Sequence, residues 1–408
     1  MYDLLSGLTV IEASSFVASP TAGLYCAQMG ADVIRVDQIG GGPDFKRAQK
    51  TAEGHSLSWE NLNRAKRSLA LDLGRPEGRE LLAELVRATG QFITNFPVSG
   101  FLSHDKLSKG CDNLITVRIM GWGDGRQAMD FTVNAAVGYP LMAGPVKQDH
   151  PAPINSPVPG WDLMTGAYAA FALLAALRRR DATGRGGEVR IPLGDVAIGS
   201  VSMLGGLAEV LYTGRNRERL GNATWGAFGR DFETRDGVLV MLTALTPKQW
   251  AALVQVLDLA EPIAALERRS GVALDSDDTR FAQRDELFAL FEPAVAARDY
   301  ADLAAALDAA GATYERYRTT LEAANDPVLV GDNPLFGRPD GPNPSGFDYP
   351  AAGPFAALPG DNRGAPRPAP LNGQHSEQVL AERLNLSSGE IARLIDAGIV
   401  GTARTQHA

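Results

Sequence analysis

The feature that most constrains the fold is an uncharged apolar stretch in the first half of the chain. Residues 163–177 include one threonine and no charged side chain, and most of them are strong helix formers. A helix that is apolar on every face is typical of one that is buried all round. The stretch is shorter than the roughly 20 residues that a bilayer-spanning helix needs. It therefore predicts a helix in the core of a globular protein, and no membrane partner.

Charged residues stand at both ends of this helix. Three arginines, Arg178 to Arg180, close its last turn, where cations favour the negative end of the helix dipole. Asp162 stands at its start, and aspartate is a preferred N-cap, which is the commoner role of such a residue. The free N–H groups of a first turn also favour an ionised carboxylate, which could act as a nucleophile in a partly apolar pocket. The neighbouring residues leave both roles open.

Strands that alternate with helices predict a parallel sheet. Residues 8–12 and 31–36 have the pattern of strands, and residues 20–29 between them form a predicted helix with Pro20 in its first turn. Strands joined in this way form an open α/β sheet whose ligands bind beyond the carboxyl ends of the strands. The other predicted elements are a basic turn and strand at 66–73, a helix at 76–88, strands at 91–97 and 114–119, and an edge strand around Pro192.

The first strand–helix–strand unit does not predict a dinucleotide site. No glycine falls between Val10 and Pro20, where the phosphate-binding turn would lie. The triple glycine at 40–42 follows the second strand, but Pro43 comes next instead of a helix start. We interpret those glycines as a tight turn.

Composition excludes several classes of protein. The chain has 408 residues, 45% of them hydrophobic, and a formal net charge of −9, which does not favour a nucleic-acid surface. Cys26 and Cys111 are the only cysteines and form no C-x-x-C pair, and the five histidines have no metal-ligand spacing. Neither a disulfide framework nor a metal site is expected. No signal-peptide pattern opens the sequence, so a reducing, cytoplasmic location is expected.

The pattern of elements predicts two domains. Residues 1–198 form the predicted large domain, which residues 375–408 complete with two short helices. An apolar helical run at 196–211 leads through a linker at 199–224 into a smaller α/β domain at 225–322. That domain opens with a hairpin whose turn is Asp236-Gly237. A Pro/Gly-rich connector at 323–374 is predicted to return the chain to the large domain.

Several motifs resemble those of the family III CoA-transferases, which include carnitine CoA-transferase, formyl-CoA transferase and α-methylacyl-CoA racemase types. They are Gly160-Trp161-Asp162, the alanine-rich helix, the arginine triplet, and Thr183-Gly184-Arg185-Gly186. The resemblance extends from Leu8 to about Ile399. It implies that Asp162 is the catalytic nucleophile, that coenzyme A is part of an acyl-CoA substrate, and that no cofactor is tightly bound. It also implies a Rossmann-like large domain, a smaller α/β domain, and a homodimer of interlinked chains.

The same resemblance implies two groups of substrate-binding residues. The CoA-binding surface would be formed by Ser15, Phe16, Val17, Ala18, Gln38, Leu71, Arg75, Asn95 and Phe96. Relatives often have a basic residue in place of Gln38, so Lys46, Arg47, Lys66 or Arg67 could contact the phosphates instead. Phe16 and Val17 replace polar residues of some relatives and predict a more apolar acyl pocket. Trp225, Gly226, Ala227, Phe228 and Gly229 occupy the place of a glycine-rich loop that covers the active site in some members, although a simple turn explains them equally well.

The resemblance also narrows the predicted activity. Racemase-type members have a catalytic histidine where this chain has Met129, which cannot transfer a proton, so racemisation is not expected. Segments at 16–18, 40–47, 93–97 and 226–234 resemble members that move CoA between the two carboxyl groups of one dicarboxylic acid. We expect such an intramolecular transfer through an anhydride on Asp162. An intermolecular CoA-transferase with a separate acid acceptor and a non-catalytic acyl-CoA-binding protein are the alternatives.

Overall fold

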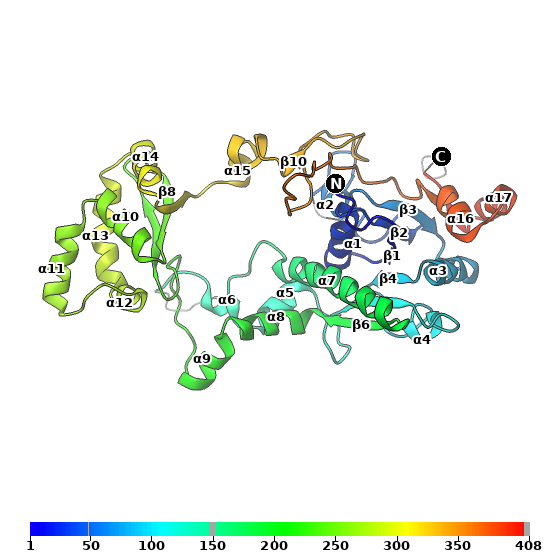
Figure 1. Ribbon diagram of the computed structural model, residues 1–408, viewed down its shortest axis with the longest axis horizontal. Helices are drawn as coiled ribbons and strands as arrows, with labels where there is room; N and C mark the ends of the chain where they lie inside the picture. Colours follow the sequence, from blue (N-terminus) through cyan, green and yellow to red (C-terminus); the bar gives the residue numbers. More distant parts are fainter. Residues whose placement is uncertain (48, 147–151, 404–408) are drawn as a thin grey trace. The chain divides into compact units, whose positions relative to one another are not determined.

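The computed structural model describes residues 1–47, 49–146 and 152–403 (Figure 1). Contacts between residues divide the chain into two compact units, each of which is built from separate segments. The large unit comprises Met1–Val137, Ser156–Glu209 and Pro327–Ala408, and the small unit comprises Gly138–Asn155 and Val210–Asp326.

A seven-stranded sheet forms the centre of the large unit, in the order β12-β3-β2-β1-β4-β5-β6. All neighbouring strands are parallel except β12, which is antiparallel to β3. The α/β prediction with a mostly parallel sheet is thus confirmed. The β6 strand lies at the edge, where Pro192 costs no ladder hydrogen bond on its outer side. The strands are β1 (Thr9–Ala13), β2 (Asp32–Gln38), β3 (Arg67–Leu71), β4 (Gln91–Thr94), β5 (Ile115–Met120), β6 (Gly187–Pro192) and β12 (Val400–Gly401).

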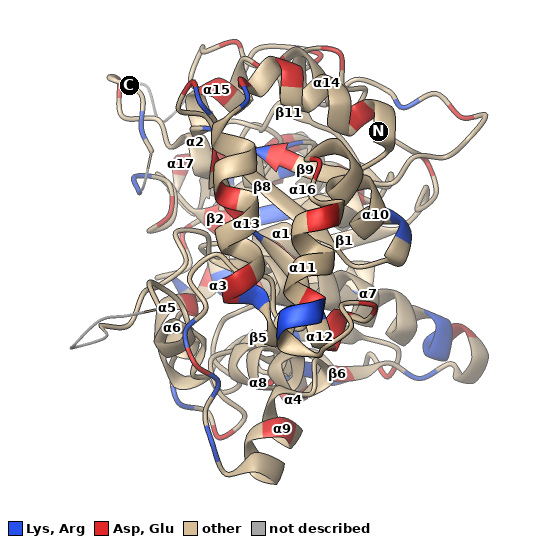
Figure 2. Ribbon diagram, turned by 90° about the vertical axis from the view of Figure 1, so that its left-hand side faces the viewer, with Lys and Arg blue, Asp and Glu red and all other residues tan. Residues whose placement is uncertain are grey.

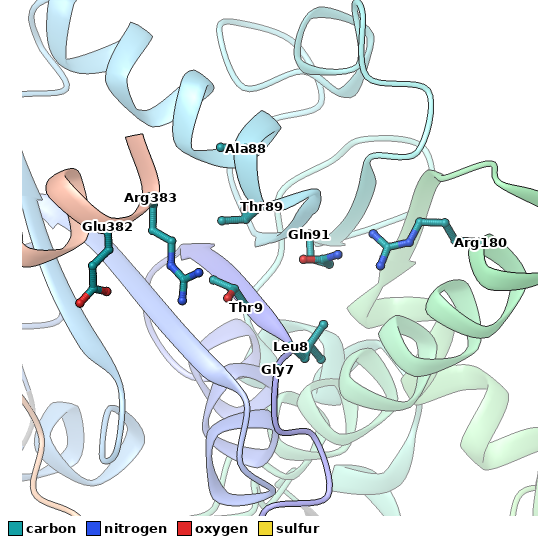
Figure 3. Close-up of a pocket in the computed structure, with 9 residues that line it drawn as sticks. All are labelled: Gly7, Leu8, Thr9, Ala88, Thr89, Gln91, Arg180, Glu382 and Arg383. Atoms are coloured by element: carbon teal, nitrogen blue, oxygen red, sulfur yellow. The ribbon is translucent and has the colours of Figure 1, made fainter. Parts of the chain in front are cut away.

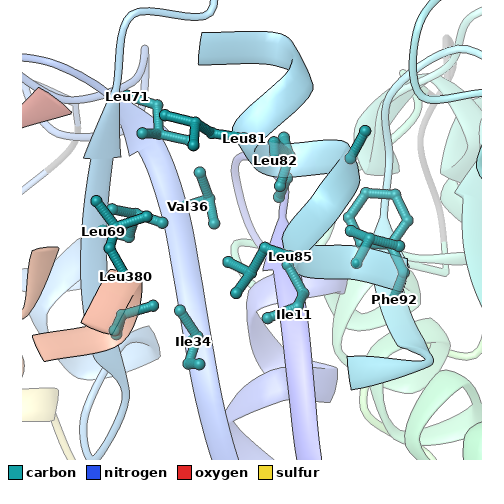
Figure 4. Close-up of a cluster of buried hydrophobic side chains, with 14 of the residues drawn as sticks. Ile11, Ile34, Val36, Leu69, Leu71, Leu81, Leu82, Leu85, Phe92 and Leu380 are labelled. Carbon is teal, nitrogen blue, oxygen red and sulfur yellow. The ribbon is translucent and has the colours of Figure 1, made fainter. Parts of the chain in front are cut away.

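Helices cover both faces of this sheet. One face packs against α3 (Pro76–Thr89) and α16 (Ser376–Leu384), whose leucines meet the strands in a buried apolar cluster (Figure 4). The other face packs against α1 (Ala18–Gln28) and α7 (Gly160–Thr183). The sheet is therefore buried on both sides, as expected for parallel strands. The remaining helices of this unit are α2 (Leu57–Leu62), α4 (His104–Leu107), α5 (Asp130–Ala136), α8 (Leu193–Met203) and α17 (Ser388–Asp396).

The long helix α7 is buried on one face only, which corrects the prediction that it is buried all round. Its small residues approach α1 closely, and a Cβ atom added to Gly166 would lie 2.6 Å from the carbonyl oxygen of Ala18. The opposite face is exposed in the single chain and carries Met164, Tyr168, Phe171 and Leu174. The helix has 24 residues, so by length and composition it could cross a bilayer. Packing against α1 and the sheet is the behaviour of a core helix instead.

The predicted helix at 196–211 is two helices. The first, α8, ends at Met203, and α9 (Gly206–Thr213) begins after Gly205, whose φ of +76° lies in the left-handed region. A helix cannot continue through that conformation, which glycine adopts at little cost.

The small unit contains a three-stranded antiparallel sheet in the order β7-β8-β9. Its first two strands form the predicted hairpin, with Gly237 at φ +80° in the turn. Phenylalanine and leucine side chains from the sheet and from α13 build its core. Its elements are α6 (Tyr139–Met142), β7 (Phe228–Glu233), β8 (Leu239–Ala244), α10 (Pro247–Val256), α11 (Ala260–Ser270), α12 (Asp277–Ala282), α13 (Arg284–Ala296), α14 (Tyr300–Ala310), β9 (Thr313–Arg316) and α15 (Thr320–Ala324). Its helices carry both acidic and basic residues, and those that the structure describes form no continuous basic stripe (Figure 2).

The unit boundaries differ from the predicted domains in three places, one of which is the predicted linker at 199–224, which is divided between the two units at Val210. Residues 138–155 belong to the small unit, where Arg219 donates hydrogen bonds to the carbonyl oxygens of Leu141 (2.9 Å) and Ala152 (2.7 Å). The Pro/Gly-rich residues from 327 onward belong to the large unit and are more than a connector. Glu60, which is buried, accepts hydrogen bonds from the hydroxyl of Tyr349 and the N–H of Ser345. This segment includes a π-helical turn (Pro327–Gly331) and the short strand pair β10 (Phe336–Gly337) and β11 (Ala351–Ala352).

Candidate active site

The predicted nucleophile lies in the first turn of α7, but it does not cap the helix. Pro159 occupies the N-cap position, and no side chain of α7 itself caps the turn. Instead, the N–H of Asp162 donates a 2.9 Å hydrogen bond to Oδ2 of Asp130, which lies at the start of α5. The capping role that the sequence left open for Asp162 is therefore taken by Asp130. The carboxylate of Asp162 makes no hydrogen bond with any residue that the structure describes.

A second contact fixes the start of α7 against α5. The indole Nε1 of Trp161 donates a 3.0 Å hydrogen bond to Oδ1 of Asn134, one turn after Asp130. Two successive residues of α7 are thus held by two residues of one short helix. This arrangement sets the direction in which the Asp162 side chain leaves the backbone.

Burial and charge change the acidity of Asp162. Burial raises its pKa to about 7, the negative charge of Asp130 acts in the same direction, and the positive charge of Arg47 opposes both. Burial also raises the pKa of Asp130, although the N–H groups of Asp162 and Trp161 act against this shift. A carboxylate with a raised pKa is more basic than an ordinary one and hence a stronger nucleophile once ionised. Perturbed carboxyl groups of this kind cluster at functional sites.

Two loops at the carboxyl ends of β1 and β4 are joined by Asn95. Its Oδ1 accepts the N–H of Ser15 (3.1 Å), and its Nδ2 donates to the carbonyl oxygen of Ser15 (2.9 Å). Asn95 therefore positions the loop after β1. In the loop after β4, Arg118 donates a hydrogen bond to the carbonyl oxygen of Phe96 (2.7 Å). The Phe96 ring is partly buried against the core.

Phe16 is held in an unusual backbone conformation. Its φ is 71°, in the left-handed region that non-glycine residues rarely adopt, and its N–H donates a 3.1 Å hydrogen bond to Oδ2 of Asp44. The ring is 42% exposed, and the guanidinium carbon of Arg47 lies 5.2 Å from the ring centroid. Because Arg47 also acts on the pKa of Asp162, the ring, the cation and the carboxylate belong to one neighbourhood.

A network of buried charges supports this loop from below. Arg35 is fully buried and contacts carboxylate oxygens of Asp37 (2.8 Å), Glu12 (3.0 Å) and Asp44 (3.1 Å). Lys66 contacts the second oxygen of Glu12 at 2.8 Å, and burial lowers the pKa of Lys66 to about 8. Arg35 also donates to the carbonyl oxygen of Ser14 (3.0 Å). The network therefore reaches the loop directly through Arg35, and through Asp44 it also holds the N–H of Phe16.

The structure sorts the basic residues that were considered for the CoA phosphates. The ammonium of Lys66 is enclosed by Glu12 and the carbonyl oxygen of Pro20, so it cannot meet a ligand. Arg67 pairs with Asp32 at the amino ends of the strands, away from the loops after β1 and β4. Both suggestions are wrong for that reason. Lys46 and Arg47 are exposed and remain candidates.

The other predicted CoA-binding residues differ in accessibility. Leu71 is fully buried and forms part of the core, so its side chain cannot line a binding surface, and Ala18 is 7% exposed. Gln38 is exposed and bonds to Asp72 (3.2 Å). Arg75 is exposed and donates to the carbonyl oxygen of Ala397 (2.7 Å). Residues 15–17 retain accessible surface beside the start of α1.

The predicted lid residues belong to the small unit, and most of them are buried. Phe228 begins β7 and is 0% exposed, and Ala227 is 3% exposed, so neither side chain can cover a site. A Cβ atom on Gly229 would lie 2.4 Å from Oγ1 of Thr224, which makes this glycine a packing residue. Gly226 has φ +69°, as the simple-turn interpretation predicts. Trp225 is the member of this group that keeps a largely exposed ring (43%).

Sequence reasoning missed the partners that organise the site. It considered Met129 and not its neighbour Asp130. Asp130 accepts a hydrogen bond from Asp162, which lies 32 positions further along the chain. Asp44 and Glu12 likewise gave no local signal, because their role depends on the buried position of Arg35. Within the described residues, no group of three or more His, Cys, Asp or Glu side chains is arranged to hold a metal ion. A partly buried carboxyl group with a raised pKa, as at Asp162, is able to act as a nucleophile once it is ionised.

Comparison with known proteins gives a consistent result. The model of CoA-transferase family III matches residues 5–376. The 2-methylfumaryl-CoA isomerase of Chloroflexus aurantiacus is 44% identical over 407 residues, which is 98% of each chain. The succinyl-CoA:glutarate CoA-transferase of Mus musculus is 25% identical and aligns with 98% of this chain and 91% of its own.

A solved structure shows the same fold. A CAIB/BAIF family protein from Brucella suis superimposes with a TM-score of 0.77 at 25% identity, covering 94% of this chain and all of the other. The family model, the sequence relatives and the fold agree over nearly the whole length. The chain therefore belongs to CoA-transferase family III and is an enzyme of a family that uses acyl-CoA substrates.

Proposed function

We propose that this enzyme moves CoA between the C1 and C4 carboxyl groups of mesaconate (2-methylfumarate) within one molecule, so that it acts as a 2-methylfumaryl-CoA isomerase. The 44% identity with the Chloroflexus enzyme of that name supports the substrate. The observation that carries the chemistry is the Asp162 carboxylate. It is partly buried, has a raised pKa, and makes no hydrogen bond with the described residues.

The first step is attack on the thioester. An oxygen of ionised Asp162 bonds to the thioester carbonyl carbon, the carbon–sulfur bond breaks, and CoA leaves as a thiolate. The product is a mixed anhydride between Asp162 and the mesaconyl group. The N–H groups of Trp161 and Asp162 are occupied by Asp130, so it is the positive end of the α7 dipole that can stabilise negative charge on oxygen beside the reacting carboxyl group.

The exchange of ends uses the same side chain. CoA thiolate attacks the Asp162 carbonyl carbon of the anhydride, which releases mesaconate and leaves an aspartyl–CoA thioester. Mesaconate turned end for end then attacks through its C4 carboxylate and expels CoA thiolate, which finally takes the acyl group from the new anhydride. Because the two carboxyl groups of mesaconate are trans, the freed molecule must rotate without escaping. Holding it nearby corresponds to effective molarities of roughly 10⁵ M or more.

The neighbourhood of Asp162 fits this requirement. The Phe16 ring offers an apolar wall, and Arg47 supplies a cation for whichever carboxyl group of mesaconate is free. Within the described part of the chain, Arg47 forms no ion pair with an acid, so it is available to the substrate. An arginine can bind a carboxylate through two parallel hydrogen bonds.

The test is turnover without an acceptor. Purified enzyme is incubated with mesaconyl-C1-CoA and no other acid, and the two CoA isomers are separated by chromatography. Formation of mesaconyl-C4-CoA is expected. Isomerisation that needs added succinate would instead support the intermolecular transferase, which the 25% identity with the succinyl-CoA:glutarate enzyme keeps as the second candidate. CoA binding without any product would support the non-catalytic protein.

Variants of two aspartates identify the nucleophile. Asp162→Ala should abolish turnover while CoA still binds. The matched control is Asp195→Ala, because Asp195 also lies in the first turn of a helix, α8, but is exposed. Hydroxylamine added during turnover should leave a hydroxamate on Asp162, detected by mass spectrometry. A hydroxamate on another residue, or substantial turnover by Asp162→Ala, contradicts the mechanism.

We further propose that the chain acts as a homodimer with interlinked chains, in the cytoplasm. The exposed apolar face of α7, with Met164, Tyr168, Phe171 and Leu174, supports a partner surface, since exposed patches of this kind mark interaction sites. The free thiols of Cys26 and Cys111 fit a reducing compartment. Analytical ultracentrifugation should give twice the chain mass of 43.4 kDa. A monomer at micromolar concentration would contradict the dimer.

A further inference from the structure

A pocket lies in the large unit at the amino ends of the strands, away from Asp162. Its volume is about 410 Å³. The residues that line it come from the start of β1, the turn between α3 and β4, the last turns of α7, and the end of α16 (Figure 3). Asp162 and Arg180 are 18 residues apart on α7, and a helix rises about 1.5 Å per residue, so the pocket is about 27 Å from the nucleophile. The lining residues are Gly7, Leu8, Thr9, Ala88, Thr89, Gln91, Arg180, Glu382 and Arg383.

Gln91 lines this pocket with its side-chain amide. The residue is 6% exposed, and its side chain makes no hydrogen bond with any residue that the structure describes. The amide atoms are not enclosed by protein, so their donors and acceptor are available to water or to a ligand in the pocket. Figure 3 shows the Gln91 amide between the β1 start and Arg180.

Arg180 faces the same space with most of its donors unused. Its Nη1 makes one long contact, 3.4 Å, with the carbonyl oxygen of Gly90. Within the described chain it pairs with no carboxylate, in contrast to Arg383, whose Nη2 lies 2.6 Å from Oδ2 of Asp32. A guanidinium has five N–H donors in a planar fork that matches a carboxylate or a phosphate.

Arg383 enters from the opposite side. Its Nη2 bonds to Asp32 and its Nε is buried out of reach of a ligand, whereas its Nη1 makes no hydrogen bond with any residue that the structure describes. In Figure 3 the side chains of Arg180 and Arg383 approach the pocket from its two sides. Arg67, Arg180 and Arg383 carry three positive charges. Asp32 and Glu382 carry two negative charges, so the group has a net charge of one positive unit.

We propose that this pocket binds a small dianionic oxyanion, separately from the acyl-CoA site. A ligand with negative charge at both ends would pair with Arg180 at one side and with the Nη1 donors of Arg383 at the other. The amide of Gln91 and the hydroxyl of Thr9 would bond to it between them. Short dicarboxylates and inorganic phosphate share this chemistry, and the pocket volume accommodates either. The proposal does not depend on which acyl-CoA reaction Asp162 performs.

Binding to the full-length enzyme by titration calorimetry tests the proposal. Succinate and inorganic phosphate are titrated separately, with saturating CoA present so that the acyl-CoA site is occupied, and acetate serves as the monoanion control. We expect one of the dianions to bind at least about tenfold more tightly than acetate, because it engages two cationic sides. Tighter binding of succinate identifies the dicarboxylate as the ligand class, and tighter binding of phosphate identifies phosphate. No binding of either dianion below about 10 mM overturns the proposal.

Variants in the pocket locate the binding. Arg180→Gln and Gln91→Leu should each weaken the dianion about tenfold or more, whereas Asp162→Asn should leave it unchanged. The matched control is Arg178→Gln, since Arg178 is exposed on the same turn of α7 and does not line the pocket. Circular dichroism melting curves confirm that each variant is folded. Equal affinity in Arg180→Gln and in Arg178→Gln overturns the proposal, as does loss of binding in Asp162→Asn.

Discussion

The support of the Phe16 loop in the large unit and the core of the small unit are built by opposite means. Under the loop that carries Phe16, the large unit buries Arg35 and Lys66 together with Glu12, Asp37 and Asp44. The core of the small unit is made of rings, with Phe228 and Phe291 at 4.4 Å between centroids and Trp250 beside both. Charges with fixed hydrogen-bond directions orient a loop, whereas rings fill volume and tolerate small shifts.

The difference predicts unequal responses to substitution. Removing one member of a buried ion pair leaves an uncompensated charge and is strongly destabilising. Exchanging one apolar side chain for another of similar size costs less, because the core can repack around it. The charged region should therefore be the less tolerant of the two, and it is also the region that supports the candidate active site.

The largest expected effect is that of Arg35→Met. It leaves the carboxylates of Glu12, Asp37 and Asp44 without their cation, so we expect the free energy of unfolding to fall by about 3–5 kcal/mol. Urea denaturation measures the loss, and hydrogen exchange in peptides of β1 and β2 locates it. The control is Arg126→Met, whose ion pair with Asp124 is exposed and should contribute less than about 1 kcal/mol. Equal losses in the two variants would contradict the contrast.

A smaller loss is expected for Phe228→Leu, about 1–2 kcal/mol, because the substitution is apolar for apolar in a well-packed cluster. Hydrogen exchange of the β7–β8 hairpin should rise, while KM for the acyl-CoA substrate should stay constant. If Phe228 acted in a lid, the variant would change KM and leave exchange unaltered. Trp225→Leu provides the comparison, since that ring is exposed and its loss should barely affect exchange in the hairpin.

A gain in stability is expected for Asp162→Asn. The pKa of Asp162 is raised to about 7, so the folded state holds a proton more tightly than the unfolded chain does. Wild-type stability contributed by this group is therefore present at low pH and is lost as pH rises through about 7. The asparagine variant should be more stable on the order of 1 kcal/mol at pH 8, a figure reduced for partial exposure, and the difference should vanish as pH falls toward 4. Denaturation at both pH values measures it, and a less stable variant at pH 8 would refute the raised pKa.

The smallest effect concerns Asp130→Asn, which keeps an oxygen acceptor for the N–H of Asp162 but removes the negative charge. The pKa of Asp162 should fall, because Asp130 helps to raise it. The acid limb of the pH profile of kcat/KM should then move to lower pH by less than about one unit. Asp124→Asn, on the exposed surface, should leave the profile in place. A shift to higher pH would show that the two carboxyl groups are not coupled in this way.

The sequence predicted the parts of the fold that depend on local pattern. The alternation of strands and helices, the edge strand at Pro192 and the hairpin at Asp236-Gly237 are all predicted from neighbouring residues. It did not predict that α7 keeps an exposed apolar face, because composition cannot distinguish a face covered by its own chain from one that is left uncovered. It also missed that residues 138–155 join the small unit, since Arg219 reaches them across more than 60 positions.

The same limit applies to the candidate site, because only residues with a local sequence pattern could be singled out. Asp162 was noticed as a charged residue at the start of an apolar helix, but its predicted role as nucleophile came from the resemblance to the family, because the neighbouring residues left a capping role open. Phe228 was misread, because an aromatic residue beside glycines looks alike in a loop and at the start of a buried strand. Asp130 and Asp44 act on backbone N–H groups far along the chain, and no spacing rule reports such contacts.

The left-handed backbone at Phe16 bears on how substrate preference could diverge among descendants of this enzyme. Glycine adopts that torsion without the steric penalty that a phenylalanine incurs, so glycine at this position would relax the main chain while removing the ring. In the proposed mechanism, where Phe16 forms a wall of the acyl cavity, a roomier cavity is thus accessible through a replacement that leaves the scaffold intact. Very few mutations, beginning at position 16, would accordingly be needed to change a narrow substrate selectivity into a broad one.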